Sequence, residues 1–230
     1  MSGSLQTSYT AVIPAFNAAE TLAEAIASIR AQTMPPQRIL VVDDGSTDST
    51  PDIAQAEGAE VLRQPNGGPG SATTLGLLQV RTPIVAFLDA DDSWLEGKAE
   101  AQLRRLDERR DLDGIFGRLR CFRHGLPVMD NAPVQDGWSR SVMMLRTASA
   151  LRVGPLYDPP QGNRGELIDW LTRARMLGLK FEMMSEILAL RRIIAGSLSY
   201  GYNGSDHGYL DVARRSILRR RGLLATDKGN

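Results

Sequence analysis

The sequence predicts an α/β fold: a mixed, mainly parallel sheet flanked by helices. Two observations favour it. Over the first 100 residues, short apolar runs alternate with segments whose apolar residues recur at helical spacing. Each run also ends in a polar or glycine-rich loop, as expected of parallel strands joined by helical crossovers. The 230 residues, 42% hydrophobic and 23% charged, match one large globular domain and exclude a wholly disordered chain.

The first half is expected to supply four strands and the helices between them. Asn17, with Glu20 three positions on, is expected to cap the first helix, and Pro51 to stand in the first turn of the second. The strands are predicted at residues 10–13, 38–42, 59–63 and 84–88. The helices are predicted at 18–30, from 50 onward, 71–80 and 95–106.

The second half is less regular. Its strands are predicted at residues 114–122, 141–146 and 187–194, and its loops at 123–139 and 158–165. A helix is expected over 166–177, ended by Gly178 at the position after the cap, where glycine is favoured. A basic helix is expected over 209–221.

Ligands of such sheets bind at the carboxyl ends of the strands, so the loops there carry the functional predictions. The fourth strand is followed by Asp89, Ala90, Asp91 and Asp92. Three carboxylates repel one another, and Mg²⁺ or Mn²⁺, held together with substrate phosphates, would remove that cost. The alternative is a surface turn whose Asp92 or Ser93 caps a helix.

Two further loops carry weaker signals. Asp43 and Asp44, after the second strand, can accept hydrogen bonds from a ribose or a base edge, although an Asx turn fits equally well. The loop 66–70 is rich in glycine and lets its N–H groups approach a phosphate. Its glycine spacing matches neither a dinucleotide fingerprint nor a P-loop, and a flexible connector is the alternative.

Taken together, these loops resemble family 2 glycosyltransferases of the GT-A fold. The likeness lies in VIPAFNAAETLAEAIASI, ILVVDDGSTDST, NGGPGSATTLG and IVAFLDADDSW, over about residues 9–110, and is looser over 151–192. It implies an inverting hexosyltransferase with a Rossmann-like sheet, a nucleotide-diphosphate donor (UDP-sugar expected) and Mn²⁺ or Mg²⁺ at Asp91. Asp44 would contact the base or ribose, and Asp89 the sugar and ribose. The implied nucleotide-binding set is Pro14, Ala15, Phe16, Asn17, Glu20, Asp43, Asp44, Gly68, Asp89 and Ala90.

The resemblance also locates a catalytic base, with one departure. Relatives often carry Glu-Asp at the start of the helix predicted at 166–177, and the Asp is the base. Here Glu166 is followed by Leu167. Either Glu166 or Asp169 is expected to serve instead, because residues three apart lie on one helix face and can point at one pocket. A carboxylate that only caps the first turn is the alternative.

Two more departures from relatives leave other functions open. Thr73-Thr74 stands where relatives often carry Arg-Asn, and Ile194 stands where they frequently carry a histidine. Arg191 or Arg192 is still expected to neutralise a diphosphate bidentately. The alternative for these arginines is a solvated strand face. A catalytically impaired nucleotide-sugar or carbohydrate-binding protein is therefore the main alternative. A sugar nucleotidyltransferase is less favoured, since no basic glycine loop follows the first strand. A haloacid-dehalogenase-type phosphatase would carry its Asp-x-Asp element on an earlier strand.

The domain organisation follows from these assignments. Residues 1–8 are expected to be a disordered lead, and 9–208 a single domain with a nucleotide-binding half (9–110) and an acceptor half (111–208). Residues 209–230 form a basic C-terminal helix and tail. The net charge is zero, which argues against nucleic acid as partner. The cancellation hides an acidic first 100 residues, with 5 basic and 13 acidic side chains, and a basic remainder.

Location and acceptor are predicted only in outline. A single cysteine, Cys121, and no apolar run long enough to span a membrane favour a cytoplasmic protein. The C-terminal helix can touch an anionic membrane or a lipid-linked acceptor through Arg214, Arg215, Arg219, Arg220 and Arg221. The alternative is a terminal helix packed by Leu210, Ile217 and Leu218. The acceptor is expected to be a saccharide, a lipid-linked molecule or a peptide.

Overall fold

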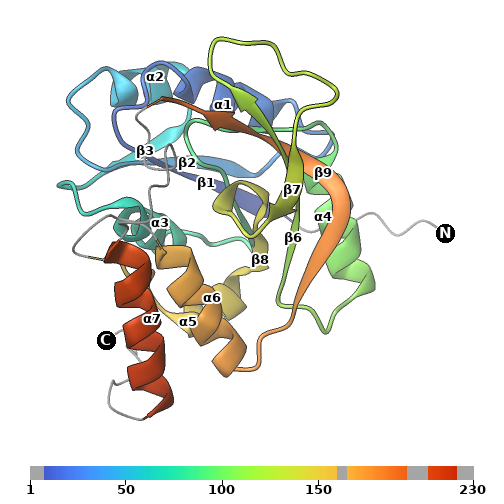
Figure 1. The fold of residues 1–230 in the computed structure, drawn as a ribbon. Coiled ribbons are helices and arrows are strands. Elements are labelled where there is room, and N and C mark those ends of the chain that lie inside the picture. The colour runs from blue at the N-terminus through green and yellow to red at the C-terminus, as the bar shows by residue number, and fades with distance from the viewer. Residues whose placement is uncertain (1–7, 160–164, 196–206, 222–230) are drawn as a thin grey trace.

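A computed structural model describes residues 8–159, 165–195 and 207–221, so most of the predicted lead lies outside it. Within this part, one sheet has the order β3-β2-β1-β4-β8-β6-β9-β5, and β7 pairs with β6 (Figure 1). The strands are β1 Tyr9–Ala15, β2 Arg38–Asp43, β3 Glu60–Arg63, β4 Ile84–Phe87, β5 Ser93–Trp94, β6 Gly114–Arg123, β7 Val134–Gly137, β8 Met144–Arg146 and β9 Phe181–Ile193. The helices are α1 Leu22–Arg30, α2 Thr50–Ala56, α3 Pro69–Leu78, α4 Lys98–Glu108, α5 Thr147–Val153, α6 Glu166–Met176 and α7 His207–Arg220, with a 3-10 turn, η1, at Arg140–Val142.

The predicted mixed sheet flanked by helices is confirmed. Strands β1 to β4 run parallel, and β6 runs parallel to β9. Strand β8 joins the two groups, antiparallel to both β4 and β6. All four strands predicted in the first half are present. Strands β1, β2 and β4 are largely buried and read as apolar runs, as expected inside a parallel sheet, whereas β3 at the edge is partly exposed.

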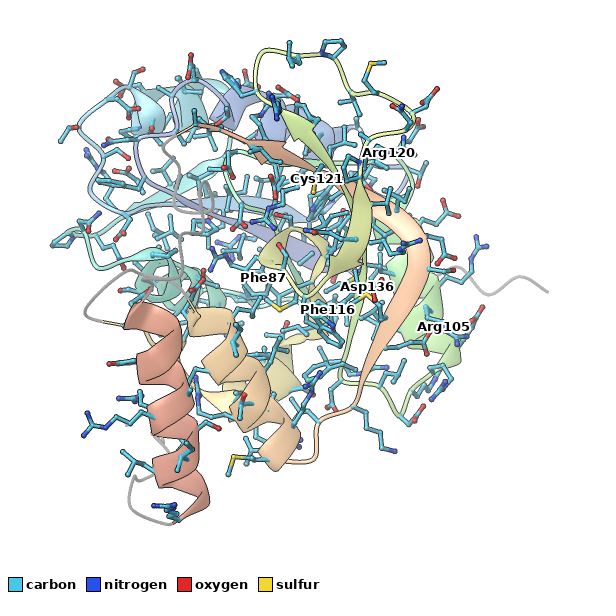
Figure 2. All side chains as sticks on the ribbon, viewed as in Figure 1. Phe87, Arg105, Phe116, Arg120, Cys121 and Asp136 are labelled. Carbon is cyan, nitrogen blue, oxygen red and sulfur yellow. The ribbon has the colours of Figure 1, made fainter. Side chains whose placement is uncertain are left out.

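Helices cover both faces of the sheet (Figure 1). One core lies beneath α1, α2 and α4, and the other beneath α3, α5 and α6. Phe87 and Phe116, labelled in Figure 2, belong to the second core. Helix α3 approaches β1 so closely that a Cβ atom on Gly76 would lie 2.4 Å from Cγ1 of Val12. The glycine is therefore required by packing.

The predicted capping box at Asn17 is wrong. Helix α1 begins at Leu22, and Asn17 has a φ of 47°, outside any helix. Its side-chain oxygen accepts the backbone N–H of Thr47 at 2.9 Å, in the loop after β2. Asparagine tolerates this left-handed conformation, and the bond to a neighbouring loop replaces the expected bond to its own helix.

The second half departs further from the pattern. Strand β9 begins at Phe181, six residues before the predicted start, and the strand predicted over 141–146 is divided between η1 and β8. Helix α6 occurs as predicted, and Gly178 ends it with a φ of 79° and an N–H bond to the carbonyl of Arg175. The longer β9 pairs with β6 through register shifts, which break the apolar alternation.

Helix α7 packs against α6, as the figure shows (Figure 1). The predicted apolar packing of this helix needs correction, because Ile217 is 52% exposed whereas Arg219 is only 6% exposed. The side chain of Leu210 lies outside the described part. In the residues that the structure describes, no helix is long and apolar enough to cross a membrane.

Candidate active site

The loops that follow β1, β2 and β4 meet at one edge of the sheet (Figure 1). Strand β1 pairs in parallel with both neighbours, Ala15 opposite Asp43 and Val12 opposite Phe87. Parallel strands that lie side by side end on the same edge. The structure therefore brings together the residue groups 14–17, 43–48 and 89–92 that the sequence indicated.

The first two loops are tied to each other. The side chain of Asn17 accepts the N–H of Thr47, and the N–H of Asn17 donates to the hydroxyl of Ser46 at 2.9 Å. These bonds fix the backbone at the end of β1. Phe16 is left 49% exposed at the rim, where an aromatic ring is available to a ligand. Glu20 is also exposed, 3.8 Å from the ring of His124.

Asp43 and Asp44 differ in what they hold. The buried carboxylate of Asp43 accepts Arg63 Nε at 2.9 Å and the N–H of Ser46 at 3.2 Å, so it closes its own turn. Asp44 accepts Gln64 Nε2 at 2.7 Å on Oδ1, which also takes one backbone N–H of the glycine loop. Oδ2 takes a second such N–H at 2.8 Å. A carboxylate has about four acceptor positions, so one remains on Oδ2.

The glycine loop gives its N–H groups to carboxylates rather than leaving them for a phosphate. Gly67 and Gly68 donate to Asp44, each at 2.8 Å. Gly70 and Ser71, at the start of α3, donate to Asp158 at 2.7 and 2.5 Å. A Cβ atom on Gly68 would lie 2.7 Å from the carboxyl carbon of Asp158, so glycine is needed there for this approach. Asp158 could not be recognised from sequence patterns, because its partners lie 87 and 88 positions away.

The acidic turn after β4 contains three carboxylates in different surroundings. Asp92 is almost fully buried and accepts the hydroxyl of Ser141 at 2.5 Å and the N–H of Arg192 at 2.9 Å. Burial, and then the charges of Asp91 and Asp89, raise the pKa of Asp92 well above its usual range. Burial, and then the charge of Asp89, raise the pKa of Asp91 to about 6, while Arg191 and Arg140 oppose the rise. Asp92 therefore anchors the turn through its hydrogen bonds, and Asp91 lies beside it with a raised pKa.

This arrangement fits the divalent cation that the family resemblance implies. Among the described residues, no group of three His, Cys, Asp or Glu side chains is placed to hold a metal ion alone. Mg²⁺ typically uses one or two carboxylates together with substrate phosphates, which needs no such group. Asp91 is the carboxylate that fits, because Asp89 is bound by Arg140 and Asp92 by Ser141.

Arg140 joins the acidic turn to the start of α6. Its Nε donates to Asp89 Oδ1 at 2.7 Å, and its Nη1 donates to Glu166 Oε1 at 2.5 Å. Burial works against its charge, but the two carboxylates hold the pKa of Arg140 above its usual range. Sequence reasoning missed this residue, because it lies on η1, in a segment without apolar periodicity.

The two expected base candidates do not share a pocket. Glu166 faces Arg140, with its side chain 11% exposed. Asp169 is fully buried and accepts Arg173 Nε at 2.9 Å and the guanidinium of Arg219 from α7. Their spacing separates them by about 60° around the helix axis, which is enough to turn one toward the acidic turn and the other beneath α7.

Arg191 and Arg192 also diverge, because neighbouring residues of a strand point to opposite faces. The guanidinium of Arg192 binds the carbonyl of Asp91 at 3.0 Å and the carboxylate of Glu24, and lies over the ring of Phe122 at 4.7 Å. Arg191 is close enough to Asp91 to lower the pKa of that carboxyl. Arg192 therefore supports the acidic turn directly, and Arg191 acts on it through its charge.

Comparisons with known proteins agree with this geometry. Residues 10–138 match the model of the family described as glycosyl transferase family 2. The chain is 34% identical over 195 residues to an uncharacterized glycosyltransferase, Rv0539, of Mycobacterium tuberculosis, which covers 84% of each chain. It is 28% identical over 202 residues to TuaG of Bacillus subtilis, whose name assigns it to teichuronic acid biosynthesis, covering 82% of this chain and 80% of TuaG.

The fold is similar to solved structures of TarS from S. aureus. The complex of TarS 1-349 with UDP-GlcNAc superposes with a TM-score of 0.74 at 20% identity, over 92% of this chain and 67% of that one. A longer TarS structure gives a TM-score of 0.69 at 18% identity, over 93% of this chain and 39% of that one. At such identities the likeness concerns the fold.

Proposed function

The chain belongs to glycosyl transferase family 2, as a glycosyltransferase of the GT-A fold, and we propose that it transfers a sugar with inversion from a nucleotide diphosphate to an acceptor hydroxyl. A UDP-sugar is the proposed donor, since the similar TarS fragment was solved with UDP-GlcNAc. The observation that carries the proposal is the link from Asp89 through Arg140 to Glu166, at 2.7 and 2.5 Å. In the proposal, this link joins the donor side of the site, at Asp89, to its acceptor side, at Glu166.

On the donor side, the loops after β1 and β2 would hold the nucleotide. The exposed ring of Phe16 is available for stacking on the base, as aromatic side chains do in such sites. Asp44 keeps one acceptor position for a base or ribose group. The other proposed residues shape these loops or their rim: Pro14, Ala15, Asn17, Glu20, Asp43, Gly68 and Ala90, whose carbonyl accepts the hydroxyl of Thr21 at 2.9 Å.

The diphosphate would lie at the acidic turn. Asp91 would hold Mn²⁺ or Mg²⁺ there together with the phosphates, and the cation would offset charge on the leaving group. Asp89, fixed by Arg140, is left as a contact for the sugar and ribose. Arg191 is the proposed protein contact to the diphosphate, because the guanidinium of Arg192 is already engaged with Asp91 and Glu24.

Glu166 is the proposed base. Its Oε1 is held by Arg140, so Oε2 would take the proton of the acceptor hydroxyl. The acceptor oxygen then forms a bond to the anomeric carbon while the bond to the diphosphate breaks on the opposite face, which inverts that carbon. Such base assistance is worth roughly 10²–10⁴-fold in rate. Asp169 is not proposed as the base, because both of its oxygens face arginines inside the protein.

One observation keeps the binding-protein alternative testable. Leu167, at the position where relatives often carry Asp, is buried in the second core and offers no base. Without a base at Glu166, the site would bind a nucleotide sugar and not turn it over. A nucleotidyltransferase would instead release pyrophosphate.

The test is a panel of nucleotide sugars with Mn²⁺, with Mg²⁺ and with a chelator, using wild type, Glu166→Gln and Asp130→Asn. Asp130, fully exposed on the loop between β6 and β7, is the matched control. The proposal expects metal-dependent release of nucleoside diphosphate from wild type and the control, and loss of turnover with donor binding kept in Glu166→Gln. Pyrophosphate release, or binding with no turnover in wild type, would reject it.

The cytoplasmic location and the acceptor class, a saccharide, a lipid-linked molecule or a peptide, are part of the same proposal. Peripheral membrane contact through α7 would rely on the arginines that remain exposed. Arg214 and Arg221 are exposed, whereas Arg219 is buried and Arg215 lies over the ring of Tyr157. Anionic vesicles, compared with neutral ones, test that contact directly.

A further inference from the structure

Helix α7 holds the acceptor side of the site through two arginines. Arg219 is 6% exposed and places its guanidinium on the fully buried carboxylate of Asp169, with Nη2 3.4 Å from Oδ2. Arg215, one turn earlier, lies 3.6 Å from the centre of the Tyr157 ring. A guanidinium over an aromatic face is attractive, and a buried charge pair is costly to break. Both contacts therefore fasten α7 to its neighbours.

A chain of hydrogen bonds leads from these contacts into the segment before α6. Asp169 accepts Arg173 Nε at 2.9 Å, and the same guanidinium donates to the carbonyls of Val153 and Pro155 at 2.6 and 2.5 Å. Trp170 Nε1 donates to the carbonyl of Gly154 at 3.1 Å. Helix α7, helix α6 and residues 153–157 thus form one connected unit, which we call the C-terminal clamp.

Two site carboxylates extend from this unit. Glu166 lies one turn before Asp169 on α6 and reaches Arg140. Asp158 follows Tyr157 and binds the first N–H groups of α3. Burial, and then the negative charge of Glu166, raise the pKa of Asp158. The position of both depends on elements that α7 holds.

We propose that α7 is part of the catalytic apparatus, with Arg219 as a positioning residue that fixes Glu166 and Asp158 through Asp169 and Arg173. The inference rests on the proposed function, because it concerns the geometry of the proposed base. Loss of the Arg219 contact leaves α6 and residues 153–158 less fixed. A shift of about 1 Å in a reacting group can cost on the order of 10²-fold in rate.

The test compares Arg219→Met with Arg110→Met, a surface arginine whose side chain is 83% exposed. Arg219→Met is expected to lower kcat by roughly 10- to 100-fold, with the dissociation constant for UDP unchanged within about threefold. Arg110→Met is expected to match wild type. A fall in kcat with UDP binding intact is the signature of positioning, since general unfolding lowers both. An unchanged kcat in Arg219→Met, or a parallel loss of UDP binding, would overturn the inference.

A second measurement does not depend on turnover. Backbone hydrogen exchange of residues 153–158 and of the first turn of α6 is expected to quicken in Arg219→Met and not in Arg110→Met. If Arg219→Met fails to fold, Arg219→Lys and Asp169→Asn carry the same comparison, and a wild-type kcat in both overturns the inference. Glu166→Gln separates the proposal that Glu166 is the base from the proposal that Arg219 positions it. If Glu166→Gln keeps full activity, the proposed base is wrong, whereas exchange still reports whether α7 holds the segment.

Discussion

Arg140→Met is the substitution with the clearest predicted cost. Arg140 is the cation shared by Asp89 and Glu166, through bonds of 2.7 and 2.5 Å. A hydrogen bond to a charged group contributes about 1.5–3 kcal/mol, so the two bonds would contribute roughly 3–6 kcal/mol in a dry site. The side chain of Asp89 is 27% exposed, and water screens its share. We therefore expect the free energy of unfolding to fall by about 3 kcal/mol.

Urea denaturation of the ligand-free protein measures this change. Arg110→Met is the control, because Arg110 pairs with Asp107 on the surface and its side chain is 83% exposed. It should alter the free energy of unfolding by no more than about 0.5 kcal/mol. A loss below about 1 kcal/mol in Arg140→Met would mean that the link between the two carboxylates is not formed as described.

Three further predictions concern the metal, a buried amine and a close packing contact. Asp91→Asn should remove the dependence on Mn²⁺ from the thermal shift that UDP produces, and a persisting dependence would exclude Asp91 as ligand. Lys98 is fully buried and donates from Nζ to Gln102 Oε1 at 2.7 Å. Burial lowers the pKa of Lys98 well below its usual value. At pH values between that lowered pKa and the unfolded lysine's pKa of about 10.4, the unfolded state holds one more proton than the folded state. The free energy of unfolding therefore rises with pH there, by up to ~1.4 kcal/mol per pH unit. Lys98→Met should remove this slope in urea titrations between about pH 8 and 10, and an unchanged slope would contradict it. Gly76→Ala should destabilise the protein by about 1–3 kcal/mol in the same assay, because its Cβ would lie 2.4 Å from Val12, and wild-type stability would show that α3 can move away.

The first half of the chain could be predicted from sequence because its signals are local. Each strand is an apolar run, and each loop after it carries its polar residues in a row, as Asp43-Asp44 and Asp89 to Asp92 do. Parallel pairing then places those loops on one edge without further information. The sequence was wrong at Asn17 because the partner of its side chain, Thr47, lies 30 positions away.

The second half of the chain could not be predicted to the same depth, because its contacts link distant segments. Arg140 reaches Asp89 across 51 positions and Glu166 across 26, and Asp158 reaches Gly70 across 88. None of these pairs has a periodic signal. Helical spacing predicted Glu166 and Asp169 on one face, whereas the structure turns Glu166 toward Arg140 and Asp169 toward Arg219 of α7.

Turnover of Glu166→Gln, measured beside the binding of its donor, tests the central claim most directly. Release of UDP from a UDP-sugar with Mn²⁺ present follows turnover, and calorimetry follows donor binding. We expect a turnover roughly 10²–10⁴-fold below wild type, with the donor dissociation constant unchanged. Asp130→Asn should equal wild type in both measurements. Wild-type turnover in Glu166→Gln would contradict the assignment of this carboxylate as the base.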